Sequence, residues 1–281
     1  AVRDINLKLN GYQQSDLTII AGRPAMGKTA YALNDALHQA RLGYPVGIFS
    51  LEMSARQLTA RLFANYAGID SNKLAFGTLS QSEYDVAAGL RSSFSKLPLY
   101  IDDEPYLSLL SLKIKAKKWV REKKVKIIYI DYLQLINNNL KGRTRDQEIS
   151  EISRTLKGLA KELDIPIIAL SQLSRTVEAR GDKRPMLSDL RESGAIEQDA
   201  DNVLFLYRPE YYGIPQWEDN TPTTNEVEVI ISKFRNGTTG GIIAGCQLQY
   251  MRFFERGGNV SMNIHQENNL PKIDPKNSTP F

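Results

Sequence analysis

The chain has almost no cysteine and no long apolar run. Cys246 is the single cysteine among 281 residues, so no disulfide can form within the chain, and a reducing, cytoplasmic setting is expected. No apolar stretch approaches the roughly 18–20 residues of a membrane-spanning helix, and no signal peptide opens the chain, so no membrane partner is predicted. Residue 1 is alanine rather than methionine, which suggests a fragment of a longer protein or a processed one.

The charge balance is mildly basic, and the remaining composition is ordinary for a globular protein. The length suits one large domain or two modest ones. A formal net charge of +4 permits a nucleic-acid partner but does not require one, because solvated lysines produce the same value. The most basic stretch, Ser111 to Lys124, is better explained as a solvated helix face than as a binding surface.

A glycine-rich stretch follows the apolar run 17–21 and precedes the helix-forming run 30–37. Its pattern, Gly-x4-Gly-Lys-Thr, is that of a P-loop, in which backbone N–H groups and the positive end of a helix dipole converge on phosphate. Lys28 would neutralise the β and γ phosphates, and Thr29 would hold Mg²⁺. The alternative is a strand-to-helix turn that contains two glycines by chance. The predicted nucleotide-binding residues are Gly22, Arg23, Pro24, Ala25, Met26, Gly27, Lys28 and Thr29.

Apolar runs alternate with amphipathic helical patterns from residue 17 to 170, and then strands and a hairpin at Asn236-Gly237 follow. This order predicts one α/β domain of the P-loop type, with a mostly parallel, twisted sheet flanked by helices and an antiparallel edge hairpin. We expect the domain to span residues 1–256 and a loose tail to span 257–281. Ligands of such sheets bind at the carboxyl ends of the strands.

Three of these strand ends carry side chains suited to phosphate chemistry. Asp131 could hold Mg²⁺, or it could merely cap the next turn. Glu52 could orient and deprotonate an attacking water, or it could be a surface glutamate. The uncharged amide of Gln172 could hydrogen-bond a γ-phosphate and report whether it is present.

Two cations, Lys233 and Arg235, precede the predicted hairpin turn. Such side chains at a hairpin tip are usually only solvated. However, phosphoryl transfer benefits from an arginine supplied from outside the P-loop pocket. If subunits pack in a ring, this hairpin could reach the nucleotide of a neighbour.

Six stretches of the chain form an ordered set across about residues 5–256. They are Phe49-Ser-Leu-Glu-Met53, Ile130-Asp-Tyr-Leu-Gln-Leu135, Ala169-Leu-Ser-Gln-Leu-Ser174, Asp182-Lys-Arg-Pro185, Ser188-Asp-Leu-Arg-Glu-Ser-Gly-Ala-Ile-Glu-Gln-Asp-Ala-Asp201 and Lys233-Phe-Arg-Asn-Gly237. Together they resemble the RecA-like ATPase domain of the replicative DNA helicases of the DnaB type.

The resemblance implies a six-membered ring around single-stranded DNA. Such a ring hydrolyses ATP at subunit boundaries with Mg²⁺ and translocates to separate the duplex during replication. It also implies a role for each residue already identified. Lys28 and Thr29 bind phosphate and Mg²⁺, Glu52 is the catalytic carboxylate, Asp131 the Walker B acid, Gln172 the sensor, and Arg235, beside Lys233, the arginine finger acting on the adjacent subunit.

A loop from Arg191 through Glu192 to Gly194 resembles the DNA-backbone contact of the same family. Glycine permits close approach to a phosphate, and backbone N–H groups with one arginine read phosphates without reading sequence. The alternative for Arg191 is a salt bridge to Glu192 or Asp189. Because the loop follows Gln172, nucleotide state and DNA contact could be coupled through it.

The family also carries an N-terminal helical domain and a linker helix that docks on the neighbouring subunit, and this sequence shows neither. We therefore expect a weaker hexamer and poor unwinding, even with an intact ATP site. A stable hexamer without nucleotide or DNA would contradict this expectation. A primase and a helicase loader are the candidate protein partners.

Three other interpretations compete with a DNA motor. A recombinase or signalling ATPase with the same core is disfavoured, because residues 188–201 match the helicases best. A ring that only clamps nucleic acid is disfavoured by the intact Lys28, Glu52, Asp131 and Arg235. A small-molecule kinase would be expected to show an acceptor pocket and lid arginines, and the sequence indicates neither.

Overall fold

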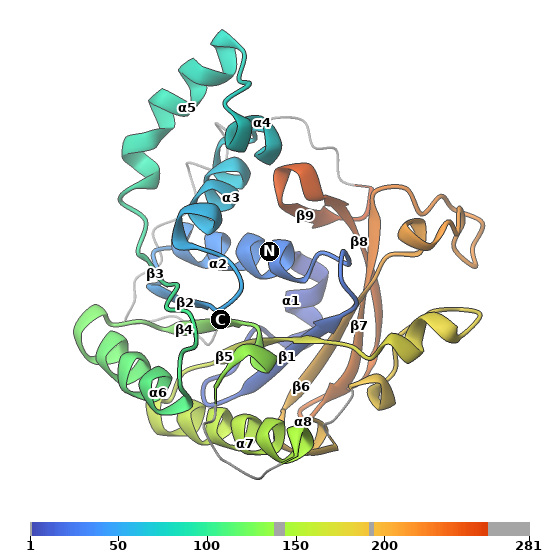
Figure 1. The fold of residues 1–281 in the computed structure, drawn as a ribbon. Helices are drawn as coiled ribbons and strands as arrows, with labels where there is room; N and C mark the ends of the chain where they lie inside the picture. The colour runs from blue at the N-terminus through green and yellow to red at the C-terminus, as the bar shows by residue number, and fades with distance from the viewer. Residues whose placement is uncertain (1, 138–143, 191–193, 258–281) are drawn as a thin grey trace.

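A single β-sheet forms the centre of the molecule, and helices cover both of its faces (Figure 1). The computed structural model describes residues 2–137, 144–190 and 194–257. Within these ranges the sheet has nine strands, in the order β3-β2-β4-β5-β1-β6-β7-β8-β9. The strands are β1 Leu17–Gly22, β2 Val46–Ser50, β3 Leu99–Asp102, β4 Ile127–Asp131, β5 Ile167–Gln172, β6 Asn202–Tyr207, β7 Glu226–Phe234, β8 Gly240–Gln247 and β9 Arg252–Glu255.

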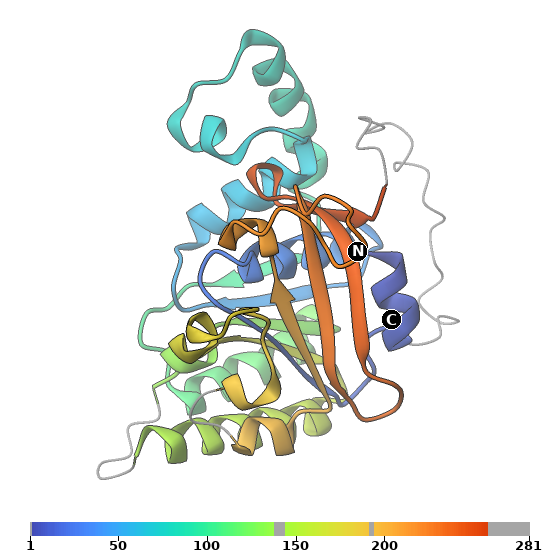
Figure 2. The same cartoon turned by 90° about the vertical axis from the view of Figure 1, so that its right-hand side faces the viewer.

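The strands from β3 to β6 in that order pair in parallel, whereas β6 to β9 pair antiparallel (Figure 2). The predicted α/β fold, with its mostly parallel sheet and antiparallel edge, is confirmed. The sequence suggests one return strand over 242–250, but β8 ends at Gln247 and a short turn leads into β9. Met251 has a φ of 53°, a left-handed conformation that breaks the strand.

Eight α-helices occur in the described ranges. Two of them, α4 and α8, have six residues each and were not predicted, because so few turns show no clear periodicity. In both views α4 and α5 stand away from the sheet, and neither buries a residue (Figures 1 and 2). The helices are α1 Arg3–Leu9, α2 Lys28–Arg41, α3 Ala55–Ala67, α4 Ser71–Phe76, α5 Gln81–Phe94, α6 Leu109–Lys118, α7 Arg145–Leu163 and α8 Gly194–Asp199.

Two apolar cores lie on opposite faces of the sheet, because successive side chains of a strand point to opposite sides. In β1, Ile19 packs with α7 and its neighbours, while Ile20 packs with α1 and α2. Apolar residues of α7 recur three and four positions apart, a spacing that predicts one buried face, and that face, which includes Ile152 and Leu156, is buried in the first core. With both faces covered, the carboxyl ends of the parallel strands are left to form a site.

Local sequence signals set several helix boundaries. Ser54 begins α3 through a capping box with Gln57, in which each side chain binds the other's backbone N–H. Gly43, with a φ of 90°, follows the end of α2, as its position predicts. The predicted helix from Ser111 begins earlier, after Ser108, and its last turn widens into a π-helix over Trp119–Lys123.

Candidate nucleotide-binding site

The glycine-rich loop joins the carboxyl end of β1 to the first turn of α2. Ala25 and Gly27 adopt left-handed φ values of 64° and 91°. A Cβ added at Gly27 would lie 3.1 Å from Leu248 Cδ2. The tight turn therefore needs glycine at this position for its conformation and for its close packing.

Lys28 lies at the start of α2 and is turned back onto the loop. Its Nζ donates hydrogen bonds to the carbonyl oxygens of Gly22 (2.9 Å) and Arg23 (3.2 Å). Burial lowers the pKa of Lys28 to about 8, and the negative charges of Asp131 and Glu52 only partly oppose this shift. A cation held on neutral carbonyls in a partly dehydrated cleft is well suited to bind phosphate.

Thr29 and Asp131 meet across the cleft. Thr29 Oγ1 donates a hydrogen bond to Asp131 Oδ2 (2.7 Å). Burial raises the pKa of Asp131, the hydrogen bond from Thr29 lowers it, and Glu52 raises it further. Hydroxyl and carboxylate oxygens are ligands that Mg²⁺ prefers. Among the described residues, no group of three or more His, Cys, Asp and Glu side chains is placed to hold a metal ion.

The predicted strand-end residues converge on one cleft of ≈ 390 Å³, whose lining includes Lys28, Thr29, Glu52, Asp131 and Gln172. The register of the parallel strands explains why these residues lie together. Ser50 at the end of β2 pairs with Asp131 on β4, and Gly22 at the end of β1 pairs with Gln172 on β5. Parallel strands in register bring their carboxyl ends to one edge, so residues far apart in sequence face one space.

Other residues of the cleft were not predicted as site residues: Arg61 on α3, Tyr132 after β4, and Leu248 and Met251 before β9. No spacing rule links them to the P-loop. Gln134 is a further supporting residue, because its Nε2 donates to Ser171 Oγ (2.9 Å) at the end of β5.

Two predicted nucleotide-binding side chains are engaged elsewhere. Arg23 donates from Nε to Glu178 Oε1 (2.9 Å) and from Nη1 to the Leu173 carbonyl oxygen (3.0 Å). Met26 is buried in the apolar core beside α2. At these positions only the backbone is left to face a phosphate. Arg208 also supports the loop, donating to the Ala25 carbonyl oxygen (3.2 Å).

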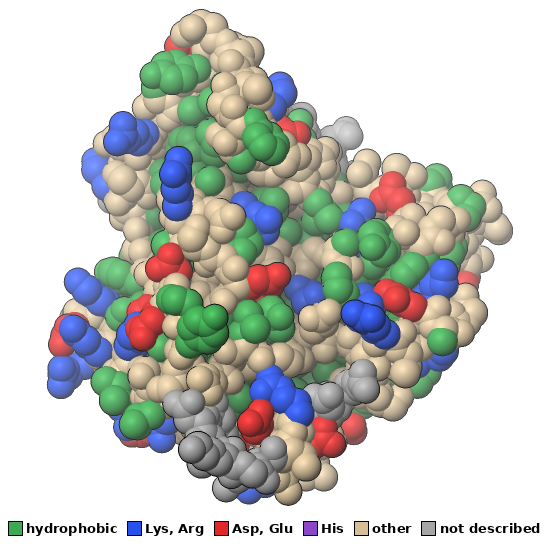
Figure 3. All heavy atoms as spheres, viewed as in Figure 1, with side chains coloured by type: hydrophobic (Ala, Val, Ile, Leu, Met, Phe, Trp, Pro, Cys, Tyr) green, Lys and Arg blue, Asp and Glu red, His purple; other side chains and the backbone are tan. Residues whose placement is uncertain are grey.

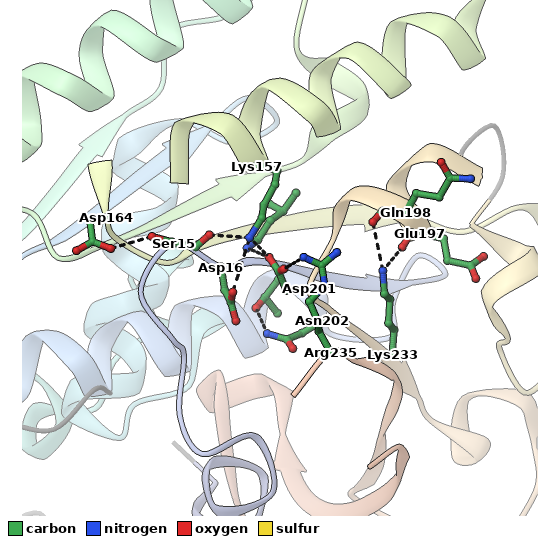
Figure 4. A network of polar contacts seen from close by, with 12 residues as sticks. Ser15, Asp16, Lys157, Asp164, Glu197, Gln198, Asp201, Asn202, Lys233 and Arg235 are labelled. Atoms are coloured by element: carbon green, nitrogen blue, oxygen red, sulfur yellow. Dashed lines mark hydrogen bonds and ion pairs between the residues drawn. The ribbon is translucent and has the colours of Figure 1, made fainter. Parts of the chain in front are cut away.

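Lys233 and Arg235 lie at the opposite end of the strands from the P-loop. Figure 4 shows them beside Asp201 and residues 197–198 of α8. Phe234, between them, pairs with Asn202, the first residue of β6, whereas the P-loop follows the last residue of the parallel strand β1. Arg235 Nη1 forms an ion pair with Asp201 Oδ1 (2.8 Å), and Lys233 binds carbonyl oxygens of α8. Neither cation can reach the cleft of its own chain.

The predicted DNA-contact loop is only partly described. Arg191 and Glu192 lie outside the described residues, and Gly194 is the exposed first residue of α8. Asp189, weighed as a partner for Arg191, accepts a hydrogen bond from Arg180 Nη1 (2.8 Å). Its carboxylate is buried, so Arg180 supplies the positive charge that it needs.

The basic helix α6 carries mixed charge on its surface. Lysine and arginine side chains gather near this helix in Figure 3, with acidic side chains among them. Lys115 Nζ lies 2.6 Å from Asp102 Oδ2, and Lys117 Nζ lies 2.6 Å from Glu162 Oε1. These pairs support the interpretation of a solvated helix face.

None of the described helices is both long and apolar enough to span a bilayer.

Comparison with known sequences gives a match to one family. Residues 1–255 match the family described as "DnaB-like helicase C terminal domain". The chain is 44% identical over 277 residues to a protein of Rickettsia bellii named "Replicative DNA helicase DnaB", covering 89% of this chain and 56% of that protein. It is 44% identical over 252 residues to a protein of the same name from Geobacillus stearothermophilus, covering 89% and 54%. The chain thus spans about half the length of the curated relatives it matches.

Solved structures agree. A structure described as an ATPase domain superposes with a TM-score of 0.83 at 37% identity, covering 90% of this chain and 89% of that one. A second, described as a DnaB-like replicative helicase and its interactions with primase, has the same TM-score and identity, covering 90% and 60%.

Proposed function

The chain belongs to the family of DnaB-like helicase C-terminal domains, and from this premise we propose that it is the ATP-driven motor of a replicative DNA helicase. One observation carries the proposal most directly: Lys28, Thr29, Glu52, Asp131 and Gln172 line one cleft at the carboxyl edge of the parallel sheet. A chance P-loop sequence would have no reason to face a carboxylate pair and an amide from three other strands.

ATP would bind with its phosphates against the loop. Lys28 exchanges its two carbonyl partners for the β and γ phosphate oxygens. Thr29 and Asp131, already in contact, would hold Mg²⁺, which when bound neutralises charge developing on the phosphates. The pair fits this ion because both side chains offer oxygen ligands.

Glu52 and Gln172 would act at the γ-phosphate end. Glu52 is exposed at the end of β2 and can orient an attacking water and accept its proton. Gln172 can donate a hydrogen bond to a γ-phosphate oxygen, and its strand continues into the segment that leads to the predicted DNA loop. Loss of the γ-phosphate would therefore be transmitted along this segment to the predicted DNA loop, at Arg191, Glu192 and Gly194.

Arg235 and Lys233 complete the site in trans. They lie at the end of the strands opposite their own P-loop, which supports a role at the nucleotide of a neighbouring subunit rather than at their own. Such a role would need a ring of subunits, and we propose a homo-hexamer around single-stranded DNA. A primase is a further proposed partner, since one structural neighbour is described with its primase interactions. We also propose a helicase loader as a partner and a cytoplasmic location.

The decisive test is subunit mixing. ATP hydrolysis is measured with and without single-stranded DNA, at low salt and at a concentration where sedimentation shows association. Arg235→Ala should lose the DNA-stimulated rate, because an arginine finger contributes about 10³–10⁵-fold. Lys28→Ala should be inactive because it cannot hold phosphate.

Mixing the two variants should restore activity above that of either alone, since an intact P-loop of one subunit then faces an intact finger of another. An Arg235→Ala variant as active as the wild type in the associated state, with no gain on mixing, would contradict the trans finger.

A further inference from the structure

Arg235 is tied to Asp201 at two points (Figure 4). The backbone N–H of Arg235 donates to the Asp201 carbonyl oxygen (3.0 Å), and Arg235 Nη1 pairs with Asp201 Oδ1 (2.8 Å). The Asp201 side chain is 1% exposed, whereas that of Arg235 is 50% exposed. One edge of the guanidinium is therefore held inside the subunit while much of the group stays accessible from outside.

Asp201 is in turn tied to Leu17 at two points. Asp201 N–H donates to the Leu17 carbonyl oxygen (2.9 Å), and Leu17 N–H donates to Asp201 Oδ2 (2.8 Å). Leu17 begins β1, whose last residue, Gly22, opens the P-loop. Asp201 thus joins Arg235 to the strand that leads to the subunit's own nucleotide site.

A second cation balances the buried carboxylate. Lys157 on α7 donates to Asp201 Oδ2 and to the Ser15 carbonyl oxygen (2.8 Å), and it lies 3.7 Å from Asp16 Oδ1. With Lys157 in place, Asp201 does not depend on Arg235 for its charge partner. Asp201 can therefore hold the guanidinium without requiring all of its donors.

A guanidinium carries five N–H donors in a planar fork, so one side chain can bind a carboxylate at one edge and phosphate oxygens at another. A free arginine must lose rotamer freedom when it reaches a transition state. Arg235 has already lost much of that freedom because Asp201 fixes both its backbone and one Nη. Reduced reorganisation is a recognised source of catalytic rate.

We propose that Asp201 is a positioning residue that orients Arg235 toward the nucleotide of the neighbouring subunit, with Lys157 balancing its charge. The inference rests on the proposed function, because it requires a finger that acts in trans. It adds a residue that never touches nucleotide yet sets the rate at a neighbour's site. The alternative is that Asp201 serves only to secure β1 and α7.

The test compares Asp201→Asn with Arg235→Ala and with the double variant, in the DNA-stimulated ATPase assay at a concentration where the wild type associates. Asparagine keeps an acceptor for Leu17 N–H but loses the charge that holds the guanidinium. We expect kcat to fall about tenfold or more, with KM for ATP unchanged, because the subunit's own P-loop is intact. Asp164→Asn is the matched control, because Asp164 accepts a hydrogen bond from Ser15 Oγ (2.8 Å) in the same polar network but is not bonded to Asp201 or Arg235 in Figure 4, and it should keep the wild-type kcat.

The double variant separates positioning from general support. If Asp201 acts through Arg235, the double variant should be no slower than Arg235→Ala alone. A further loss in the double variant, or a wild-type kcat in Asp201→Asn, would overturn the inference while leaving the trans finger intact. An Arg235→Ala variant with wild-type activity would overturn both proposals together.

Folding is checked by circular dichroism and by nucleotide binding. If Asp201→Asn does not fold, Asp201→Asn combined with Lys157→Met removes both buried charges, an exchange that proteins often tolerate. The same non-additivity with Arg235→Ala is then expected, and its absence would refute the inference.

Discussion

We predict that the half-buried Lys28 ammonium makes affinity for ATP fall as pH rises. Its pKa is lowered to about 8, mainly by burial, because the charged form loses hydration in the cleft. In the proposed complex, phosphate oxygens of ATP would supply that stabilisation again and keep Lys28 protonated. Affinity should therefore fall as pH rises through about 8, because a growing share of the free protein must first take up a proton.

The size of the effect follows from the protonated fraction. With a pKa of about 8 in the free protein, that fraction falls from about 0.76 at pH 7.5 to about 0.03 at pH 9.5. The apparent Kd scales with its inverse, so binding should weaken about 25-fold across this range, or about 1.9 kcal/mol. At pH 8.5 each binding event should take up about three-quarters of a proton.

Isothermal titration calorimetry measures both quantities. Kd for ATP is determined in excess Mg²⁺ at each pH, and titrations in buffers of different ionisation enthalpy give the proton uptake. Lys28→Arg is the matched control, because a guanidinium stays charged throughout the range and should give a flat profile if it binds. Wild-type affinity that is flat from about pH 7.5 to 9.5, with no proton uptake at pH 8.5, would refute the assignment.

Three further predictions concern the loop, the proposed metal-binding acid Asp131 and the core. Gly27→Ala should abolish ATP binding, whereas Gly43→Ala, which has a similar left-handed φ but open space around it, should cost only about 1 kcal/mol of stability by urea unfolding and leave binding intact. Asp131→Asn should move the midpoint of a Mg²⁺ titration of ATPase activity to higher concentration, and an unchanged midpoint would exclude a metal role. Leu156→Ala, at a fully buried site on α7, should lower the free energy of unfolding by about 2–5 kcal/mol, while the exposed Arg154→Ala on the same helix should change it by less than about 0.5 kcal/mol.

Much of the fold could be predicted from sequence, because its signals are local. The alternation of apolar runs and amphipathic helices predicts a mostly parallel sheet, and the structure confirms it. The cap at Ser54 and the glycine after α2 mark helix ends by backbone conformation and side-chain hydrogen bonds over a few residues. The short elements α4, α8 and β9 escaped prediction, because too few residues repeat for a period to show.

The residues of the site likewise fall into those that a local pattern predicts and those that depend on tertiary contacts. The P-loop spacing indicates phosphate binding without any structure, since its chemistry lies within eight consecutive residues, Gly22 to Thr29. The contact of Thr29 with Asp131, and the lowered pKa of Lys28, depend on strand register and burial. The engagement of Arg23 with Glu178 likewise depends on a packing partner 155 positions away.

Neighbouring residues encode the phosphate-binding loop, the alternating strands and helices, and the cations before the hairpin turn, so these features can be read from the chain alone. The position of Lys233 and Arg235 away from their own cleft, and the link from Arg235 through Asp201 to β1, become visible only in the folded chain. These features depend on the direction of strand pairing, because that direction sets the end of the sheet at which a residue lies. Pairing is a contact between segments far apart in the chain, and no local pattern encodes it.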